Sequence, residues 1–256
     1  MSWNEFATPL RVLTGIALAC AATVASAEVL VVRSSGPSAG SYPPGRQLPD
    51  ATTIALKPND VIVLLDGAGT RTLRGPGTFS AAASADRASG VRTTFAALVT
   101  QRTERRARIG AVRAGESDPA ANEPPRSPNI WYTDVRQSGR VCLREGALPM
   151  LWRPDVKQPL NATITAPDGS RTPLSWASGQ AAIAWPAALK LAPNGEYTLA
   201  WQKGAKPTKL TFVPIGSDPA GLEDMASALI RNGCQAQLDL LIETVALPET
   251  RPGKSG

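Results

Sequence analysis

Short apolar runs separated by turn residues recur along most of the chain, and this pattern predicts a mostly β protein. In the first part of the chain the runs occupy residues 28–33, 53–56, 60–65 and 70–73. Further on they occupy residues 131–136, 140–144, 150–153, 160–166, 174–176, 181–185, 197–202 and 209–213. Many short strands at this spacing are typical of a β-sandwich. We therefore expect a small N-terminal β module, followed by a sandwich of immunoglobulin-like architecture.

Two other segments carry apolar residues at helical spacing. One side of a predicted helix at residues 93–108 carries Phe95, Leu98 and Val99. Residues 217–247 predict two helices that meet at Asn232-Gly233, because a glycine there tolerates the left-handed conformation that ends a helix. We expect residues 217–219 to start the first of them and both to pack on the sandwich, with Cys234 at their junction.

Composition divides the chain further. Residues 115–128 are rich in proline, alanine and small polar residues, which bury too little apolar area to form a core. The predicted segments are a signal peptide at 1–27, a β module at 28–80, a basic helical segment at 81–114, a linker at 115–129, the sandwich at 130–216, a helical extension at 217–247 and a flexible tail at 248–256.

The N-terminus has the features of a secretory signal. Arg11 precedes an apolar run at residues 12–24, which is shorter than the roughly 20 residues that cross a bilayer. Ala25-Ser26-Ala27 then offers the small residues that signal peptidase requires. A buried helix, or a lipoprotein acylated at Cys20, is the alternative, but residues 17–19 match the lipoprotein pattern poorly. We expect cleavage after Ala27 and a periplasmic or secreted protein.

The cysteine and histidine content limits the disulfides, catalytic sites and metal sites that the chain can form. After cleavage the remaining cysteines are Cys142 and Cys234, and in an oxidising compartment we expect a disulfide between them rather than two free thiols. The chain has no histidine, which excludes Ser-His-Asp and Cys-His catalysis and imidazole-ligated zinc. The sequence predicts no catalytic residue, no metal site and no cofactor, although carboxylate-pair hydrolysis and calcium binding need no histidine.

Residues 56–64 (Leu-Lys-Pro-Asn-Asp-Val-Ile-Val-Leu) and 69–77 (Gly-Thr-Arg-Thr-Leu-Arg-Gly-Pro-Gly) form a leucine, a turn, an aspartate, a hydrophobic strand, a glycine turn and a second strand. This stretch resembles the extracytoplasmic domain of ferric-citrate-type (FecR-like) regulators, and the resemblance is confined to residues 28–80. Asn59 stands where that family usually has glycine. The transmembrane helix and anti-sigma segment of the family have no counterpart here, so the resemblance does not imply sigma-factor control.

The net positive charge is concentrated in one segment. Residues 86–113 contain seven arginines and two acidic residues, a local charge of +5 against +6 for the chain. Arg102, Arg105 and Arg106 share one helix face, so we predict that they bind an anionic envelope surface or an acidic partner. The alternative is a solvated helix face whose arginines complement the helix dipole. Nucleic acid is not an expected partner, because the protein is exported and no aromatics are interleaved.

Tryptophans and turn acids are the remaining candidates for a site. Trp176 and Trp185 adjoin turns and could stack on a sugar or peptide ligand, although core packing is the alternative for both. Asp155, Asp168 and Glu196 lie near turns of the sandwich and could act as an acid/base pair or bind calcium. The Asp168-Gly169 pair is also a turn signature in its own right.

These observations predict an exported binding or sensory accessory protein of the cell envelope, without catalysis. Its expected partner is a membrane-associated envelope protein or the anionic surface itself. The alternative is a carboxylate-dependent glycan hydrolase, or a carbohydrate-binding module, acting at the sandwich loops. Clustered acids beside exposed tryptophans would favour the alternative, whereas scattered acids and buried tryptophans would favour the binding protein.

Overall fold

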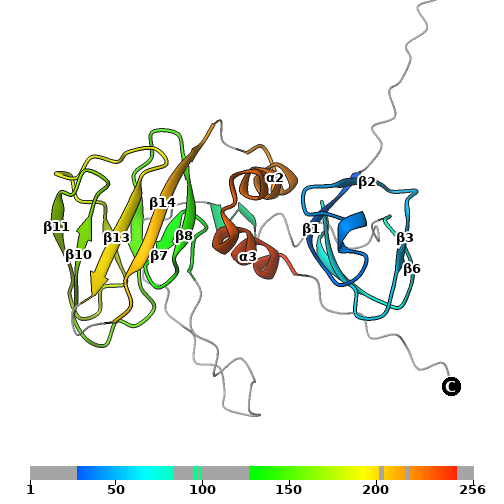
Figure 1. The fold of residues 1–256 in the computed structure, drawn as a ribbon, viewed down its shortest axis with the longest axis horizontal. Helices are drawn as coiled ribbons and strands as arrows, with labels where there is room; N and C mark the ends of the chain where they lie inside the picture. Colours follow the sequence, from blue (N-terminus) through cyan, green and yellow to red (C-terminus); the bar gives the residue numbers. More distant parts are fainter. Residues whose placement is uncertain are drawn as a thin grey trace, which may run out of the picture.

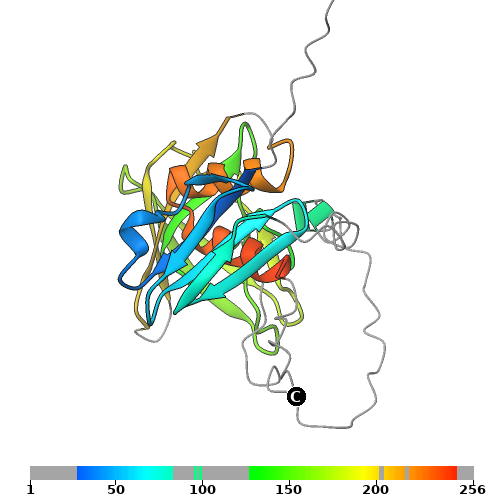
Figure 2. The ribbon, with the colours of Figure 1, turned by 90° about the vertical axis from the view of Figure 1, so that its right-hand side faces the viewer.

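The computed structural model describes residues 28–82, 95–96, 98–99, 127–201, 205–216 and 219–246. These residues form three layers: an N-terminal β module, a pair of helices and a larger β-sandwich (Figures 1 and 2). The fold is mostly β with C-terminal helices, as the apolar pattern predicts. No helix within the described ranges is long and apolar enough to cross a membrane.

The N-terminal module consists of two antiparallel sheets, ordered β2-β1-β4-β5 and β3-β6. Its elements are β1 (Glu28–Ser35), η1 (Ala39–Ser41), β2 (Gln47–Pro49), β3 (Thr53–Leu56), β4 (Val61–Asp66), β5 (Gly69–Arg74) and β6 (Gly77–Ser80). The β4–β5 ladder ends at Arg74, and Gly77 begins β6, which pairs with β3.

Strands β1 and β4 are continuously apolar because both faces of their sheet are buried. Successive side chains of a strand point to opposite faces. Val31 and Leu64 therefore point into the core of the module itself. Val32 and Leu65, one position further along each strand, point toward the helices. The unbroken apolar runs of β1 and β4 therefore follow from burial of this sheet on both faces.

The second β part is a sandwich, as predicted. It contains β7 (Tyr132–Asp134), β8 (Gly139–Arg144), β9 (Met150–Trp152), β10 (Leu160–Thr165), β11 (Arg171–Trp176), β12 (Ala182–Ala184), β13 (Glu196–Trp201) and β14 (Thr208–Ile215). One sheet has the order β11-β10-β13-β14-β8 and the other the order β12-β9-β7. The Tyr197 hydroxyl donates to the Lys190 carbonyl (2.8 Å) and accepts from the Ala192 N–H (2.7 Å). This tie resembles the tyrosine corner of immunoglobulin-like sandwiches.

Helices α2 (Leu222–Asn232) and α3 (Gln235–Thr244) form the middle layer. The α2 helix begins at Leu222, with Gly221 at its N-cap, which is later than the start predicted at residues 217–219. It ends, as predicted, at Gly233, which has φ 67°.

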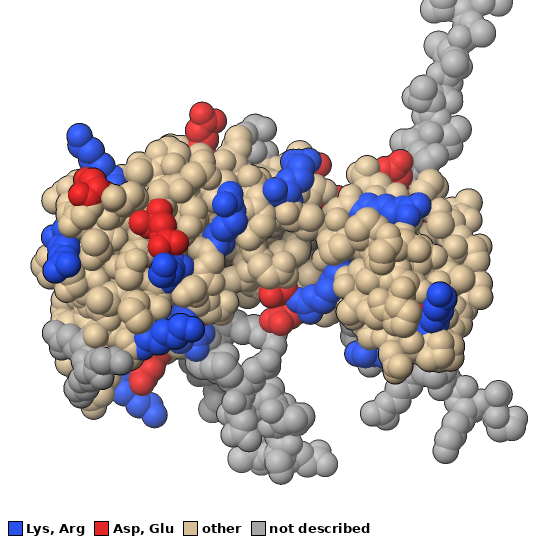
Figure 3. Space-filling model, viewed as in Figure 1, with Lys and Arg blue, Asp and Glu red and all other residues tan. Residues whose placement is uncertain are grey.

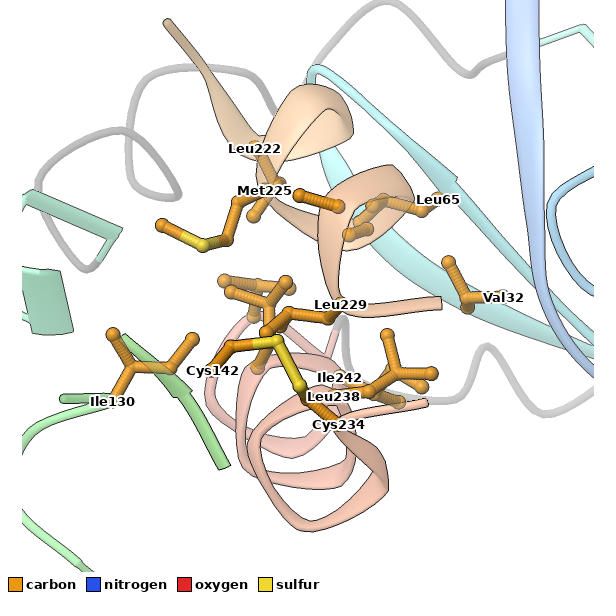
Figure 4. Close-up of a cluster of buried hydrophobic side chains, with 14 of the residues drawn as sticks. Val32, Leu65, Ile130, Cys142, Leu222, Met225, Leu229, Cys234, Leu238 and Ile242 are labelled. Carbon is orange, nitrogen blue, oxygen red and sulfur yellow. A yellow bond between two sulfur atoms is a disulfide. The ribbon is translucent and has the colours of Figure 1, made fainter. Parts of the chain in front are cut away.

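The helices pack on both β parts, not on the sandwich alone as we expected. Leu229 and Leu241 belong to a buried cluster that joins residues of β1 and β4 to residues of β8 and β14 (Figure 4). Thr70 in β5 adds two hydrogen bonds, from its N–H to Val245 O and from its hydroxyl to Ile242 O, each 3.0 Å long. The helices therefore pack against the N-terminal module and against the sandwich. This explains why they carry apolar residues on more than one side.

The helical residues Phe95, Leu98 and Val99 also contact this cluster, in agreement with the predicted apolar side of that segment. Leu98 is buried, and its carbonyl accepts a hydrogen bond from Ile130 N–H (3.2 Å).

Candidate functional site

Cys142 on β8 is the point at which the helices attach to the sandwich. It forms the predicted disulfide with Cys234, which lies at the N-cap of α3, and the two Cα atoms are 5.8 Å apart (Figure 4). Both cysteines are fully buried. The covalent link therefore lies inside the helical layer, beside Leu229 and Leu238.

The side chain of Gln237 makes a second attachment at the same residue. Its Oε1 accepts from the Cys142 N–H (2.6 Å), and its Nε2 donates to the Cys142 and Ile130 carbonyls (2.9 Å each). Since β8 is the last strand of its sheet, this amide takes the place of a neighbouring strand at Cys142. Gln237 is 5% exposed, so all three bonds are shielded from water.

Next to this attachment lies a hollow of about 370 Å³ between α3 and the segment from β7 to β8, which we name the α3–β8 groove. Its volume falls in the range of roughly 300–1,000 Å³ typical of ligand pockets. Its lining is rich in hydrogen-bonding groups, with Tyr132 and Leu240 as half-buried apolar members. The polar members include Asp134, Arg136, Gln137, Ser138, Arg140, Gln235 and Asp239.

The charged side chains of the α3–β8 groove are engaged with protein groups. Arg136 donates to Asp134 (Nη2–Oδ2 2.6 Å), and this hydrogen bond raises the pKa of Arg136 above its ordinary value. Arg140 Nε donates to the Asn232 carbonyl at the end of α2 (2.6 Å). Asp239 accepts from Arg33 and from Gln235 Nε2. These contacts hold the groove walls in fixed positions.

Asp60, the aspartate of the FecR-like pattern, organises loops of the N-terminal module. Its carboxylate accepts from the N–H groups of Ser38 (2.8 Å) and Lys57 (2.5 Å), and the residue is 1% exposed. Burial opposes ionisation, but the hydrogen bonds from Ser38 and Lys57 outweigh it and lower the pKa of Asp60. Asn59 has φ 69°, a conformation that asparagine and glycine tolerate best, so the residue that departs from the family pattern suits its position.

Trp176 and Trp185 do not form a stacking surface, and the core-packing alternative describes both. They are 0% and 4% exposed, and their indole N–H groups donate to the carbonyls of Leu151 (3.4 Å) and Leu189 (2.8 Å). Trp185 packs edge-on against the ring of Tyr197, with 5.1 Å between centroids. Trp176, at the end of β11, and Trp185, just after β12, are therefore core residues of the sandwich.

The sandwich acids do not form a catalytic pair: Asp155 lies near one end of β10, and Asp168 and Glu196 lie near the other. Asp155 precedes β10 and Asp168 follows it, so a strand of about 20 Å separates them. Asp168 accepts from the Ser170 N–H within its turn (2.8 Å), which lowers its pKa, whereas a catalytic acid needs a raised pKa. Glu196 pairs with Lys209 (3.0 Å). In the part of the chain that the structure describes, no group of three or more acidic or cysteine side chains could hold a metal ion.

The predicted surface residues Arg102, Arg105 and Arg106 and the predicted signal peptide lie outside the described residues. No known family model matches the chain, and no curated protein matches it. The α3–β8 groove was not predicted from the sequence. One signal for it existed: Gln237 is a polar residue on the side of α3 that otherwise carries Cys234, Leu238 and Leu241.

Proposed function

We propose that this chain is an exported accessory protein of the cell envelope that binds a partner without catalysis. The observation that carries the proposal is the α3–β8 groove, a hollow of ligand size lined by hydrogen-bonding side chains on a fixed frame. The disulfide between Cys142 and Cys234 supports export, since such bonds persist in oxidising compartments.

Binding is favoured over glycan hydrolysis by the arrangement of the sandwich. A glycosidase needs two carboxyl groups within about 10 Å of each other, one of them with a raised pKa. Asp155 lies at the opposite end of β10 from Asp168. Glu196 lies at the Asp168 end, but it pairs with Lys209 and Asp168 has a lowered pKa. The buried Trp176 and Trp185 also leave no stacking platform for a sugar at these loops.

The basic segment supplies a second contact in this proposal. On the face drawn in Figure 3, basic and acidic side chains are interspersed, so no part of that face attracts anions strongly. The segment with Arg102, Arg105 and Arg106 concentrates the positive charge of the chain and would hold the protein at an anionic envelope surface. The FecR-like module would then lie near a membrane-associated partner.

Retention on vesicles of anionic lipid tests the basic segment. We expect the variant with all three arginines changed to glutamine to stay folded, because glutamine has a similar helix propensity, and to lose retention. Retention of the wild type should fall steeply between 0.1 and 1 M salt, as the Debye length shortens from about 10 to about 3 Å. Equal, salt-insensitive retention of both proteins would assign the arginines to a solvated helix face instead.

Capture from envelope fractions tests the groove. Ala236 is exposed on α3 and lines the α3–β8 groove, so Ala236→Arg would fill the groove without changing a buried contact. Ala188→Arg adds the same charge at an exposed position outside the groove lining and is the matched control. We expect a cross-linked envelope partner to be lost with Ala236→Arg and kept with Ala188→Arg. A partner captured equally by both variants would place the binding surface elsewhere.

A further inference from the structure

The outer edge of β8 presents main-chain hydrogen-bonding groups to the α3–β8 groove. This strand pairs only with β14 among the described residues, so its other edge has no strand partner. The N–H and C=O of Cys142 bond to Gln237 and therefore point away from β14. Along a strand these groups alternate between the two sides. The N–H and C=O of Arg140, two positions earlier, consequently point to the outer side, where Arg140 lines the groove.

The amide of Gln237 shows what kind of group this edge accepts. It meets Cys142 with one acceptor and one donor, which is how a residue of a neighbouring strand would meet it. Beyond Gln237 the edge continues to Arg140 and Ser138 along the groove, with α3 as the opposite wall. A groove between a strand edge and a helix is the geometry in which extended peptides add a strand to a sheet.

We propose that the α3–β8 groove binds an extended peptide segment of a partner protein, which pairs with the N–H and C=O of Arg140 and lengthens the sheet by one strand. This inference rests on the proposed binding function and specifies the partner. An extended main chain offers a donor and an acceptor at the spacing that Arg140 requires.

The groove walls indicate the side chains that such a peptide carries. Asp134 and Arg136 neutralise each other, and Asp239 is paired with Arg33. Arg140 and Glu243 add one charge of each sign to the lining, so the groove has no excess charge and suits a segment of uncharged residues. An apolar side chain of the peptide contacts Tyr132 and Leu240, the half-buried apolar members of the lining.

A library of random heptapeptides displayed on phage, selected on the mature protein from residue 28, tests the proposal. We expect enriched peptides with few charges. Ala236→Arg should lower their affinity by about tenfold or more, because it fills the groove, and Ala188→Arg should leave the affinity unchanged.

Arg140→Pro removes the N–H but no bond to β14, whereas Arg140→Ala keeps the N–H and removes the same side chain. Both variants lose the side-chain bond to Asn232, so the further loss of affinity in Arg140→Pro relative to Arg140→Ala measures the main-chain pair, and equal affinities of the two would contradict it.

Amide hydrogen exchange supplies a readout that does not depend on the variants. A peptide strand at this edge should slow exchange at the Arg140 amide, while the Val141 amide, already directed to β14, should change little. Peptides that bind with no protection at Arg140, or equally well to Ala236→Arg, would overturn the proposal.

Binding of cell-wall glycan fragments in place of peptides, abolished by Ala236→Arg, would identify the ligand as a carbohydrate. In that case the proposed function would stand and this inference would fall. An envelope partner captured equally by Ala236→Arg and Ala188→Arg would instead refute the proposed function of this groove.

Discussion

Replacing Gln237 with leucine should weaken the attachment of the helical layer to the sandwich and lower the free energy of unfolding. The substitution removes three buried hydrogen bonds, two to Cys142 and one to Ile130. At about 1 kcal/mol for each bond, the free energy of unfolding should fall by about 3 kcal/mol. For a chain of this size the melting temperature should fall by about 6–12 °C. The exposed Gln235, which makes one hydrogen bond to Asp239, gives the matched control Gln235→Leu, with an expected change within about 0.5 kcal/mol.

Urea unfolding followed by tryptophan fluorescence and by far-ultraviolet circular dichroism measures both changes. If Gln237→Leu and Gln235→Leu prove equally stable, the amide does not carry the attachment that we assign to it.

Gln237→Glu adds a pH test, because a carboxylate at this position faces two carbonyl oxygens. Burial and this repulsion would raise the pKa of the introduced glutamate. Its folded state should then be more stable, relative to wild type, near pH 4 than at pH 7, since a group with a raised folded pKa loses stability as pH rises.

Three further predictions concern other parts of the molecule. Reducing the Cys142–Cys234 disulfide, which spans a sequence separation of 92 residues, should lower the free energy of unfolding by about 4.6 kcal/mol in the chain-entropy model, measured by denaturant unfolding with and without reductant. Asp60→Asn should destabilise the protein at pH 7, because Ser38 and Lys57 donate to different carboxylate oxygens and the amide NH2 that replaces one of these oxygens cannot accept. The difference from wild type should shrink below about pH 3.8, as the lowered pKa of Asp60 is titrated; a constant difference across pH would contradict this account. Terminal sequencing of the exported protein should begin at Glu28, and an acylated Cys20 would show lipoprotein processing instead.

The short-range features of the fold could be read from the sequence. Apolar runs bounded by turn residues located β1 and β4, and alternating runs located β10 and β13, because a strand is specified by a short local pattern with a turn at each end. Asn232-Gly233 located the boundary between α2 and α3 for the same reason, since a left-handed residue ends a helix locally. The Cys142–Cys234 disulfide could be predicted because these are the two cysteines that remain after the predicted cleavage.

The layers and the groove were decided only by tertiary structure. Leu65 and Leu229 are both simply apolar in the sequence, and nothing local shows that β4 and α2 bring them into one buried cluster. Trp185 adjoins a turn, yet it is buried against Tyr197 and Phe212, because burial depends on which sheet face a position takes and on what covers that face. The α3–β8 groove requires Arg140 and Ala236 to lie on opposite walls, and their separation in the chain gives no hint of it. Periodicity encodes which side of an element is apolar, whereas the partner of that side depends on packing between residues distant in sequence.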